Sequence, residues 1–135
     1  MERFLVLGVI VLLSLHLARP AAAIGAEAPA AGHKKLFHVV SIKFKDSATK
    51  EQVAEVEQAF VALKDKIPGV VSLDWGTNVS PENRSMGFTH CFVLTFASES
   101  DRDTYLHHPT HLAFVKTNLE PVLDQVLVID FWSQE

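Results

Sequence analysis

The chain has 135 residues, of which 48% are hydrophobic and 21% are charged, a composition that suits one globular domain. Its formal net charge of −4 gives no basic surface, which argues against nucleic acid as a partner. Cys91 is the single cysteine, so no disulfide can form within the chain. The fold must therefore be stable through packing alone.

The first 23 residues have the pattern of a secretory signal peptide. An apolar run over residues 4–13 follows Arg3, and a break at Pro20 with small residues at 21–23 ends the segment. The run is shorter than the stretch of about 20 apolar residues that spans a bilayer. We expect cleavage after Ala23, a secreted or periplasmic product, and no membrane attachment of the mature chain. An uncleaved N-terminal anchor is the alternative.

The residues after the expected cleavage site divide into a tether and a domain. Residues 24–34 are rich in alanine, contain two glycines and a proline, and show no periodicity, which predicts a flexible linker. Periodic patterns begin immediately afterwards. We therefore place one folded domain over residues 35–133.

The first half of the domain predicts a strand, a helix and a strand. The side chains of residues 36–45 alternate between two faces, as in a strand, and His38 lies on the more apolar face. Thr49 and Gln52 form a capping box that predicts a helix start, and Pro68-Gly69 ends the helix. The side chains of residues 71–79 again alternate between an apolar and a polar face, which predicts the second strand. The helix carries apolar residues three and four positions apart, namely Val53, Val56, Phe60, Leu63 and Ile67.

The second half predicts a strand, a broken helix and a final strand. Residues 80–87 are a polar loop, and residues 88–96 alternate as a third strand with His90 and Phe92 on one face. Residues 98–107 predict a short helix. Pro109 breaks it, and Thr110 is the expected cap of the next helix. Residues 126–132 predict the last strand.

The order β-α-β-β-α-β predicts an α+β fold of the ferredoxin-like type, a four-stranded antiparallel sheet with helices on one face. In this arrangement we expect the first and third strands to be adjacent and parallel in the centre of the sheet. His38 and His90 both lie near the start of one of these strands. They are therefore predicted to be neighbours on the helix-covered face.

The other face of the predicted sheet is too apolar for a monomer in water. Two helical segments cover only one face, and burial of apolar surface contributes about 25 cal/mol per Å². Closure of this face against a second copy predicts a homodimer. The apolar residues on this face are Phe37, Val39, Cys91, Val93, Leu127, Ile129 and Phe131.

The segment over residues 105–111 is the candidate functional element. The break at Pro109 would place Tyr105 in the last turn of one helix and His111 in the first turn of the next, where a base and a hydroxyl can face one spot. The same break can be no more than a helix corner. Residue types and spacing leave both interpretations open.

Several motifs together resemble the stress-responsive A/B barrel domain (Dabb) family over roughly residues 35–133. They include the first strand from His38, the Trp75-Gly76 pair, the entry to the third strand at His90, the His-Pro-x-His element at residues 108–111, and Asp130-Phe131. The resemblance implies a dimeric α+β barrel. It also implies roles for four residues, because a polyketide cyclase of the family has its catalytic histidine and tyrosine at positions that match His111 and Tyr105. Two further pocket histidines of that cyclase match His38 and His90.

Three functions remain open on this basis. The first is an exported homodimer that binds a small apolar or aromatic molecule between helices and sheet. The second is a cofactor-free cyclase or lyase of the aldol type, with His111 as general base and Tyr105 orienting a carbonyl. The third is a purely structural, stress-associated dimer. The expected ligand-contacting residues are His38, His90, Phe60, Trp75, Phe92 and Phe114. Export argues against a coenzyme A thioester substrate, because such thioesters are cytoplasmic.

No cofactor and no metal is expected. His107 and His111 have the spacing of a helical metal pair, but Pro109 lies between them and interrupts the helix that such a pair needs. Core packing is the alternative role for each aromatic residue of the expected pocket wall.

Overall fold

The computed structural model describes residues 34–134. The predicted signal peptide over residues 1–23 and nearly all of the linker lie outside the described residues. None of the helices in the described part is long and apolar enough to cross a membrane. The elements in order are β1 (Leu36–Phe44), α1 (Lys50–Val61), α2 (Leu63–Lys66), β2 (Val70–Thr77), β3 (His90–Phe96), α3 (Glu99–His107), α4 (Pro109–Phe114), the single π-helical turn η1 (Val115–Leu119) and β4 (Leu123–Trp132).

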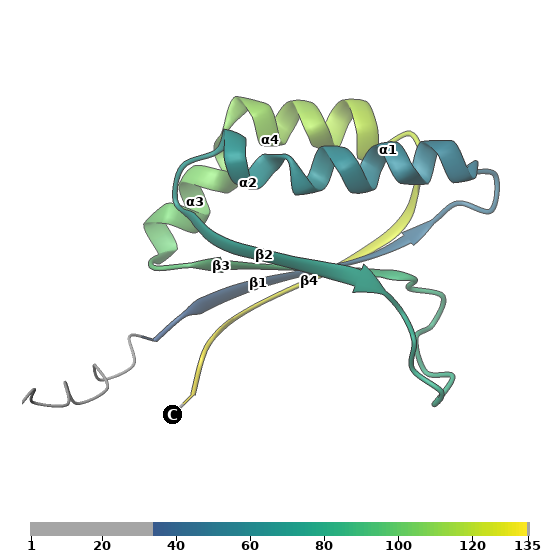
Figure 1. Cartoon of the computed structure of the whole chain (residues 1–135), viewed down its shortest axis with the longest axis horizontal. Coiled ribbons are helices and arrows are strands. Elements are labelled where there is room, and N and C mark those ends of the chain that lie inside the picture. The colour runs from purple at the N-terminus through teal and green to yellow at the C-terminus, as the bar shows by residue number, and fades with distance from the viewer. Residues whose placement is uncertain (1–33, 135) are drawn as a thin grey trace, which may run out of the picture. The chain divides into compact units, whose positions relative to one another are not determined.

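The four strands form one antiparallel sheet in the order β2-β3-β1-β4, with the helices on one face (Figure 1). This confirms the ferredoxin-like fold. The prediction that β1 and β3 run parallel was wrong. In this topology β1 and β2 run in the same direction with β3 inserted between them, so β3 is antiparallel to both.

The antiparallel pairing separates the two histidines that were predicted to be neighbours. His38 lies opposite Leu94, and His90 lies opposite Ile42. The four-residue offset corresponds to about 13 Å along the strands. Both side chains are on the helix-covered face and buried, but at opposite ends of it.

The first helix begins as predicted. Thr49 accepts a hydrogen bond from the Gln52 amide at 3.2 Å, and the Gln52 side chain accepts one from the Thr49 amide at 2.9 Å. The helix is interrupted at Ala62, and α2 adds one more turn before Pro68-Gly69. Gly69 has φ +92°, a left-handed conformation that favours glycine after a helix.

Three strands begin at other residues than the alternation of side chains predicts. β2 begins at Val70, and a bulge near Val71 leaves that side chain 58% exposed instead of sharing the covered face with Leu73. β3 begins at His90, so Phe88 belongs to the preceding loop. β4 begins at Leu123, three residues earlier than predicted.

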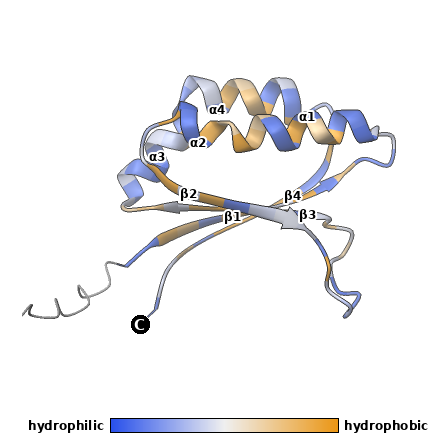
Figure 2. Cartoon of the chain, in the orientation of Figure 1, coloured by the Kyte–Doolittle hydropathy of each residue, from blue (hydrophilic) through white to orange (hydrophobic). Residues whose placement is uncertain are grey.

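The core lies between the helices and the covered face of the sheet. Its buried apolar residues are Leu36, Val40, Ile42, Val56, Phe60, Leu63, Ile67, Phe92, Leu94, Phe96, Tyr105, Phe114, Leu119 and Val122. Apolar residues also continue along β1 and β4 away from this core (Figure 2). On the open face Phe37 and Phe131 stack with ring centroids 5.1 Å apart, and Ile129 is 50% exposed.

Candidate functional site

The corner between α3 and α4 is built by His108 and Pro109. His108 is extended, with φ −65° and ψ 134°, and Pro109 occupies the first position of α4. The Thr110 amide donates a hydrogen bond to His108 Nδ1 at 3.2 Å. His108 is therefore the cap of the second helix, and the prediction that Thr110 caps it was wrong. The break at Pro109 lies where the sequence predicts it.

Across this corner Tyr105 and His111 lie side by side, with ring centroids 4.6 Å apart. Tyr105 is fully buried, and its hydroxyl has no hydrogen-bond partner among the described residues. Burial raises the pKa of Tyr105 far above its ordinary value. The phenol therefore keeps its proton and can donate one hydrogen bond that nothing in residues 34–134 accepts.

His111 is half-buried and is oriented by the main chain. Its Nδ1 lies 3.0 Å from the Leu106 carbonyl oxygen, which can only accept, so Nδ1 carries the proton. Burial lowers the pKa of His111; the Leu106 bond acts against this shift, and the positive charge of His38 adds to it. The neutral imidazole is thus favoured, and its Nε2 holds a free electron pair.

His38 lies on the other side of Tyr105, with ring centroids 6.1 Å apart, and is held by Asp130. His38 Nδ1 donates to Asp130 Oδ1 at 2.6 Å, and the Arg102 guanidinium donates to Asp130 Oδ2 at 2.7 Å. Burial raises the pKa of Asp130, but the hydrogen bonds and charges of His38 and Arg102 outweigh it and bring the pKa below its ordinary value. The Asp130 carboxylate and the Arg102 guanidinium are therefore both held in place behind His38.

Sequence reasoning missed Asp130 and Arg102 as parts of this site. The available signal was that Asp130 is the one charged residue among the apolar residues 126–132 of the predicted terminal strand. A carboxylate in such a strand needs a partner. The partner, His38, is 92 positions away in the chain and could not be identified without the β1–β4 register.

His90 forms a second, separate arrangement at the other end of the sheet. Its Nε2 lies 2.9 Å from Glu57 Oε1 on α1, and its Nδ1 lies 2.8 Å from Thr89 Oγ1. The ring packs edge-on against Phe44 at 5.0 Å and parallel to Trp75 at 6.5 Å. His90 is thus not brought to Tyr105 and His111, and both of its nitrogens are hydrogen-bonded.

The predicted pocket wall fills the space between the two histidine sites. Phe60 and Phe92 stack with centroids 3.9 Å apart, Phe114 meets Phe60 edge-on at 5.2 Å, and Trp75 stacks on Phe92 at 5.4 Å. Phe60, Phe92 and Phe114 are buried, while Trp75 is 42% exposed. These rings contact one another closely and act as core in this conformation.

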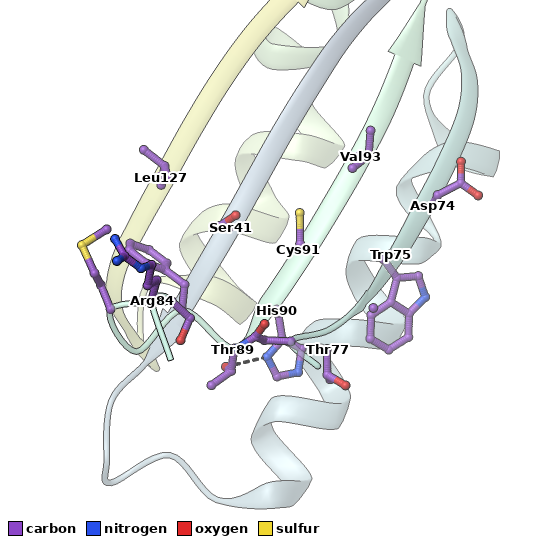
Figure 3. A pocket seen from close by; sticks show the side chains of 15 residues that line it. Ser41, Asp74, Trp75, Thr77, Arg84, Thr89, His90, Cys91, Val93 and Leu127 are labelled. Carbon is purple, nitrogen blue, oxygen red and sulfur yellow. Dashed lines mark hydrogen bonds between the residues drawn. The ribbon is translucent and has the colours of Figure 1, made fainter. Parts of the chain in front are cut away.

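Two cavities in the described residues lie at the His90 end. One, of about 340 Å³, opens between the start of α1 and His90 and is lined by Lys50, Val53 and Glu57. The other, of about 550 Å³, lies mainly on the open face of the sheet beneath the β2–β3 loop (Figure 3). Neither is lined by Tyr105 or His111. Residues 34–134 contain no group of three or more potential metal ligands.

Several plant proteins are similar in sequence to this chain. The stress-response A/B barrel domain-containing protein HS1 of Arabidopsis thaliana is 37% identical over 94 residues, which cover 70% of this chain and 85% of that protein. Olivetolic acid cyclase of Cannabis sativa is 35% identical over 77 residues, which cover 57% of this chain and 76% of the cyclase.

Several solved structures share the fold. At3g17210 of Arabidopsis thaliana superposes with a TM-score of 0.70 at 34% identity, covering 74% of this chain and 96% of that one. Hydroxynitrile lyase of Passiflora edulis superposes with a TM-score of 0.71 at 25% identity, and the match covers 77% of this chain and 97% of the lyase. A dimeric ferredoxin-like protein of unknown function from Thermobifida fusca superposes with a TM-score of 0.62 at 21% identity. The match covers 73% of this chain and 90% of that protein.

The match to a family model confirms the resemblance found in the sequence. The model of the stress responsive A/B barrel domain, Dabb, matches residues 36–133, which include every helix and strand described above. This protein belongs to the stress-responsive A/B barrel domain (Dabb) family.

Proposed function

We propose that this protein is an exported homodimer that binds a small molecule with a carbonyl oxygen and an apolar body at Tyr105, between the helices and the sheet. The observation that carries the proposal is the Tyr105 hydroxyl, which is fully buried, protonated and without an acceptor in the described residues. A buried donor without a partner costs about 1–3 kcal/mol, so such groups are uncommon in folded proteins. A ligand oxygen would remove this cost.

The neighbours of the hydroxyl favour an oxygen acceptor on an uncharged ligand. His111 is favoured in its neutral form, and the Asp130 carboxylate already accepts hydrogen bonds from His38 and Arg102. The remaining surroundings are aromatic, with Phe96 at 5.5 Å from the Tyr105 ring. A ketone or aldehyde on an aromatic or alkyl body matches this environment.

Entry of such a ligand requires movement at the corner of α3 and α4, because Tyr105 is fully buried in the closed conformation. The half-buried His111 and the 53% exposed Leu112 both lie on α4. The π-helical turn that follows, Val115–Leu119, is of a kind often found at functional sites. We infer that α4 is the element that moves.

The test is a titration with acetophenone, a small aromatic ketone, followed by NMR or calorimetry. Tyr105→Phe removes only the hydroxyl and should weaken binding about tenfold, as expected for the loss of one buried hydrogen bond. Leu106→Met, a volume-conserving change that keeps the Leu106 carbonyl, is the matched control. Equal affinity of Tyr105→Phe and the unchanged protein would contradict the proposal.

Catalysis is the second candidate, favoured by the free electron pair of His111 Nε2 beside the Tyr105 donor. Two similar proteins bear the names of a cyclase and a hydroxynitrile lyase. On a hydroxynitrile, His111 would take the hydroxyl proton, the bond to the nitrile carbon would break, and the leaving cyanide would take that proton from His111 and depart as hydrogen cyanide. Tyr105 would donate a hydrogen bond to the oxygen as it becomes a carbonyl.

Release of benzaldehyde from mandelonitrile tests the second candidate. His111→Gln and Tyr105→Phe should each abolish the rate above background, while Thr110→Ser leaves it unchanged. A rate that is independent of both residues leaves ligand binding as the function.

The homodimer and the export are supported by independent observations. The exposed apolar side chains of the open sheet face include Leu127, Ile129 and Phe131, and structural neighbours are described as dimeric. The apolar run at residues 4–13 supports export. N-terminal sequencing of the protein recovered from the medium should begin at Ile24, whereas a product that begins at Met1 would exclude cleavage.

A further inference from the structure

The polar partners of His38 come from a neighbouring strand and from the helix that carries Tyr105. Asp130 on β4 lies directly opposite His38 on β1, so the register places the two side chains on the same face of the sheet. Arg102 lies three positions before Tyr105 on α3, and side chains three positions apart share a helix face. One face of α3 therefore supplies both the Tyr105 hydroxyl and the guanidinium that binds Asp130.

The Asp130 carboxylate is held from both sides. Arg102 donates to Oδ2 at 2.7 Å and is itself fixed by a second bond, from its Nε to Asp103 at 2.9 Å. Oδ1 faces His38 Nδ1 at 2.6 Å. Burial raises the pKa of Asp130, but His38 and Arg102 hold it below its ordinary value, so the carboxylate is ionised and can only accept. His38 Nδ1 therefore carries a proton.

The other nitrogen of the His38 ring is free. Nε2 forms no hydrogen bond with another residue of 34–134. It also keeps some accessible surface, because the Tyr105 hydroxyl is the only fully buried side-chain polar atom of these residues without a partner. In the neutral ring, Nε2 is an acceptor. The centroids of the His38 and Tyr105 rings are 6.1 Å apart, so this acceptor belongs to the Tyr105 site.

The Tyr105 site thus has one donor and two acceptors that do not pair with one another. The donor is the Tyr105 hydroxyl, and the acceptors are the Nε2 atoms of His38 and His111. A simple ketone satisfies the donor alone. We propose that the ligand is a hydroxy ketone, whose carbonyl accepts from Tyr105 and whose hydroxyl donates to His38 Nε2. Asp130 and Arg102 are the positioning residues that set this preference.

His38 is the better placed of the two acceptors. It is 4% exposed and is held in the sheet by its short bond to the Asp130 carboxylate. His111 lies on α4, the element that is inferred to move. An acceptor that is already fixed loses less entropy when a ligand binds. The inference rests on the function proposed above and narrows the class of ligand.

The contact with Arg102 makes Asp130→Asn a switch of the His38 tautomer. An asparagine side chain has one acceptor oxygen, and the guanidinium, which can only donate, takes it. The amide nitrogen then faces His38 Nδ1, which must accept, so the ring proton moves to Nε2. The variant can no longer accept a hydrogen bond from a ligand hydroxyl.

The position of the proton is measured first, without a ligand. NMR of the imidazole nitrogens should place the His38 proton on Nδ1 in the unchanged protein and on Nε2 in Asp130→Asn. Asp103→Asn is the matched control, because Asp103 accepts from Arg102 but forms no hydrogen bond with His38. It should leave the proton on Nδ1. A proton on Nε2 in the unchanged protein would overturn the proposal.

Two probes then measure the preference by calorimetry. 2-Hydroxy-1-phenylethanone carries the carbonyl and the hydroxyl, and 2-methoxy-1-phenylethanone has a methyl group in place of the hydroxyl hydrogen. The unchanged protein and Asp103→Asn should bind the hydroxy ketone about fivefold more tightly, as expected for one buried hydrogen bond. Asp130→Asn should lose this ratio. General damage to the site would weaken both probes alike, so a ratio that survives in Asp130→Asn would contradict the assigned role of His38.

Further outcomes separate this inference from the function on which it rests. Failure of acetophenone to bind would overturn both. Acetophenone that binds through Tyr105, together with equal affinities for the two probes, would overturn the hydroxy ketone alone. Tyr105→Phe should weaken both probes and keep their ratio. A ratio that is lost in His111→Gln but kept in Asp130→Asn would assign the hydroxyl to His111 and would also overturn the inference.

Discussion

The Leu106 carbonyl and His111 are joined across the Pro109 break by a 3.0 Å hydrogen bond that fixes which nitrogen of the imidazole is protonated. The bond spans five positions, one more than a regular helical turn, and the Thr110 amide, which would pair with this carbonyl in a regular helix, donates to His108 Nδ1 instead. The helix corner thus orients His111 beside Tyr105.

Tyr105→Phe should stabilise the ligand-free protein. The change removes a buried hydroxyl without a partner in the described residues and keeps the ring, so the free energy of unfolding should rise by about 1 kcal/mol. Urea unfolding of both proteins measures the difference. Tyr105→Ala is the control and should lose about 3–5 kcal/mol, because it leaves a cavity. A loss of stability in Tyr105→Phe would mean that the hydroxyl has an acceptor in solution.

Acidification should destabilise the protein partly through His111. The pKa of His111 is below its ordinary value of 6.5 in the folded chain, so the unfolded chain binds more protons just below that pH. The contribution is complete above pH 6.5 and is lost as the pH falls through the folded value. His111→Gln should flatten this part of the stability profile, and an NMR titration should place the His111 pKa below 6.5. A titration at or above 6.5 would contradict the assignment.

Asp130 and His38 should be energetically coupled. Asp130→Asn removes the charge that faces the buried His38 and should cost about 1–3 kcal/mol, while Arg102→Gln, at a more exposed partner, should cost less. A double-mutant cycle with His38→Gln measures the coupling. Costs that simply add would show that the 2.6 Å contact contributes little.

Charges on the open sheet face should disrupt the dimer. Val93→Lys combined with Ile129→Lys places two ammonium groups in the apolar face and should give monomer or aggregate by light scattering. Val61→Lys, a partly exposed apolar position on α1, is the matched control and should leave the dimer intact. An unchanged dimer in the double variant would exclude this face as the interface.

Local patterns predicted most of the fold. The Thr49 capping box, the Pro109 break and the strand alternation each depend on residues a few positions apart, and all are present in the structure. The misplaced features depend on long-range geometry. The relative direction of β1 and β3 decides where His90 lies, and the partners Asp130 and Glu57 are 92 and 33 positions from the histidines that they bind. No periodicity in one segment contains that information.

The separation of His38 from His90 also makes their effects independent. The stacked rings of Phe60 and Phe92 lie in the core between them, and the two pairs, His38 with Asp130 and His90 with Glu57, share no partner. Sites about 13 Å apart without common contacts usually have additive effects on stability. One end of this fold can therefore accumulate substitutions without changing the energetic background of the other, so that the two histidine positions are free to diverge separately among relatives.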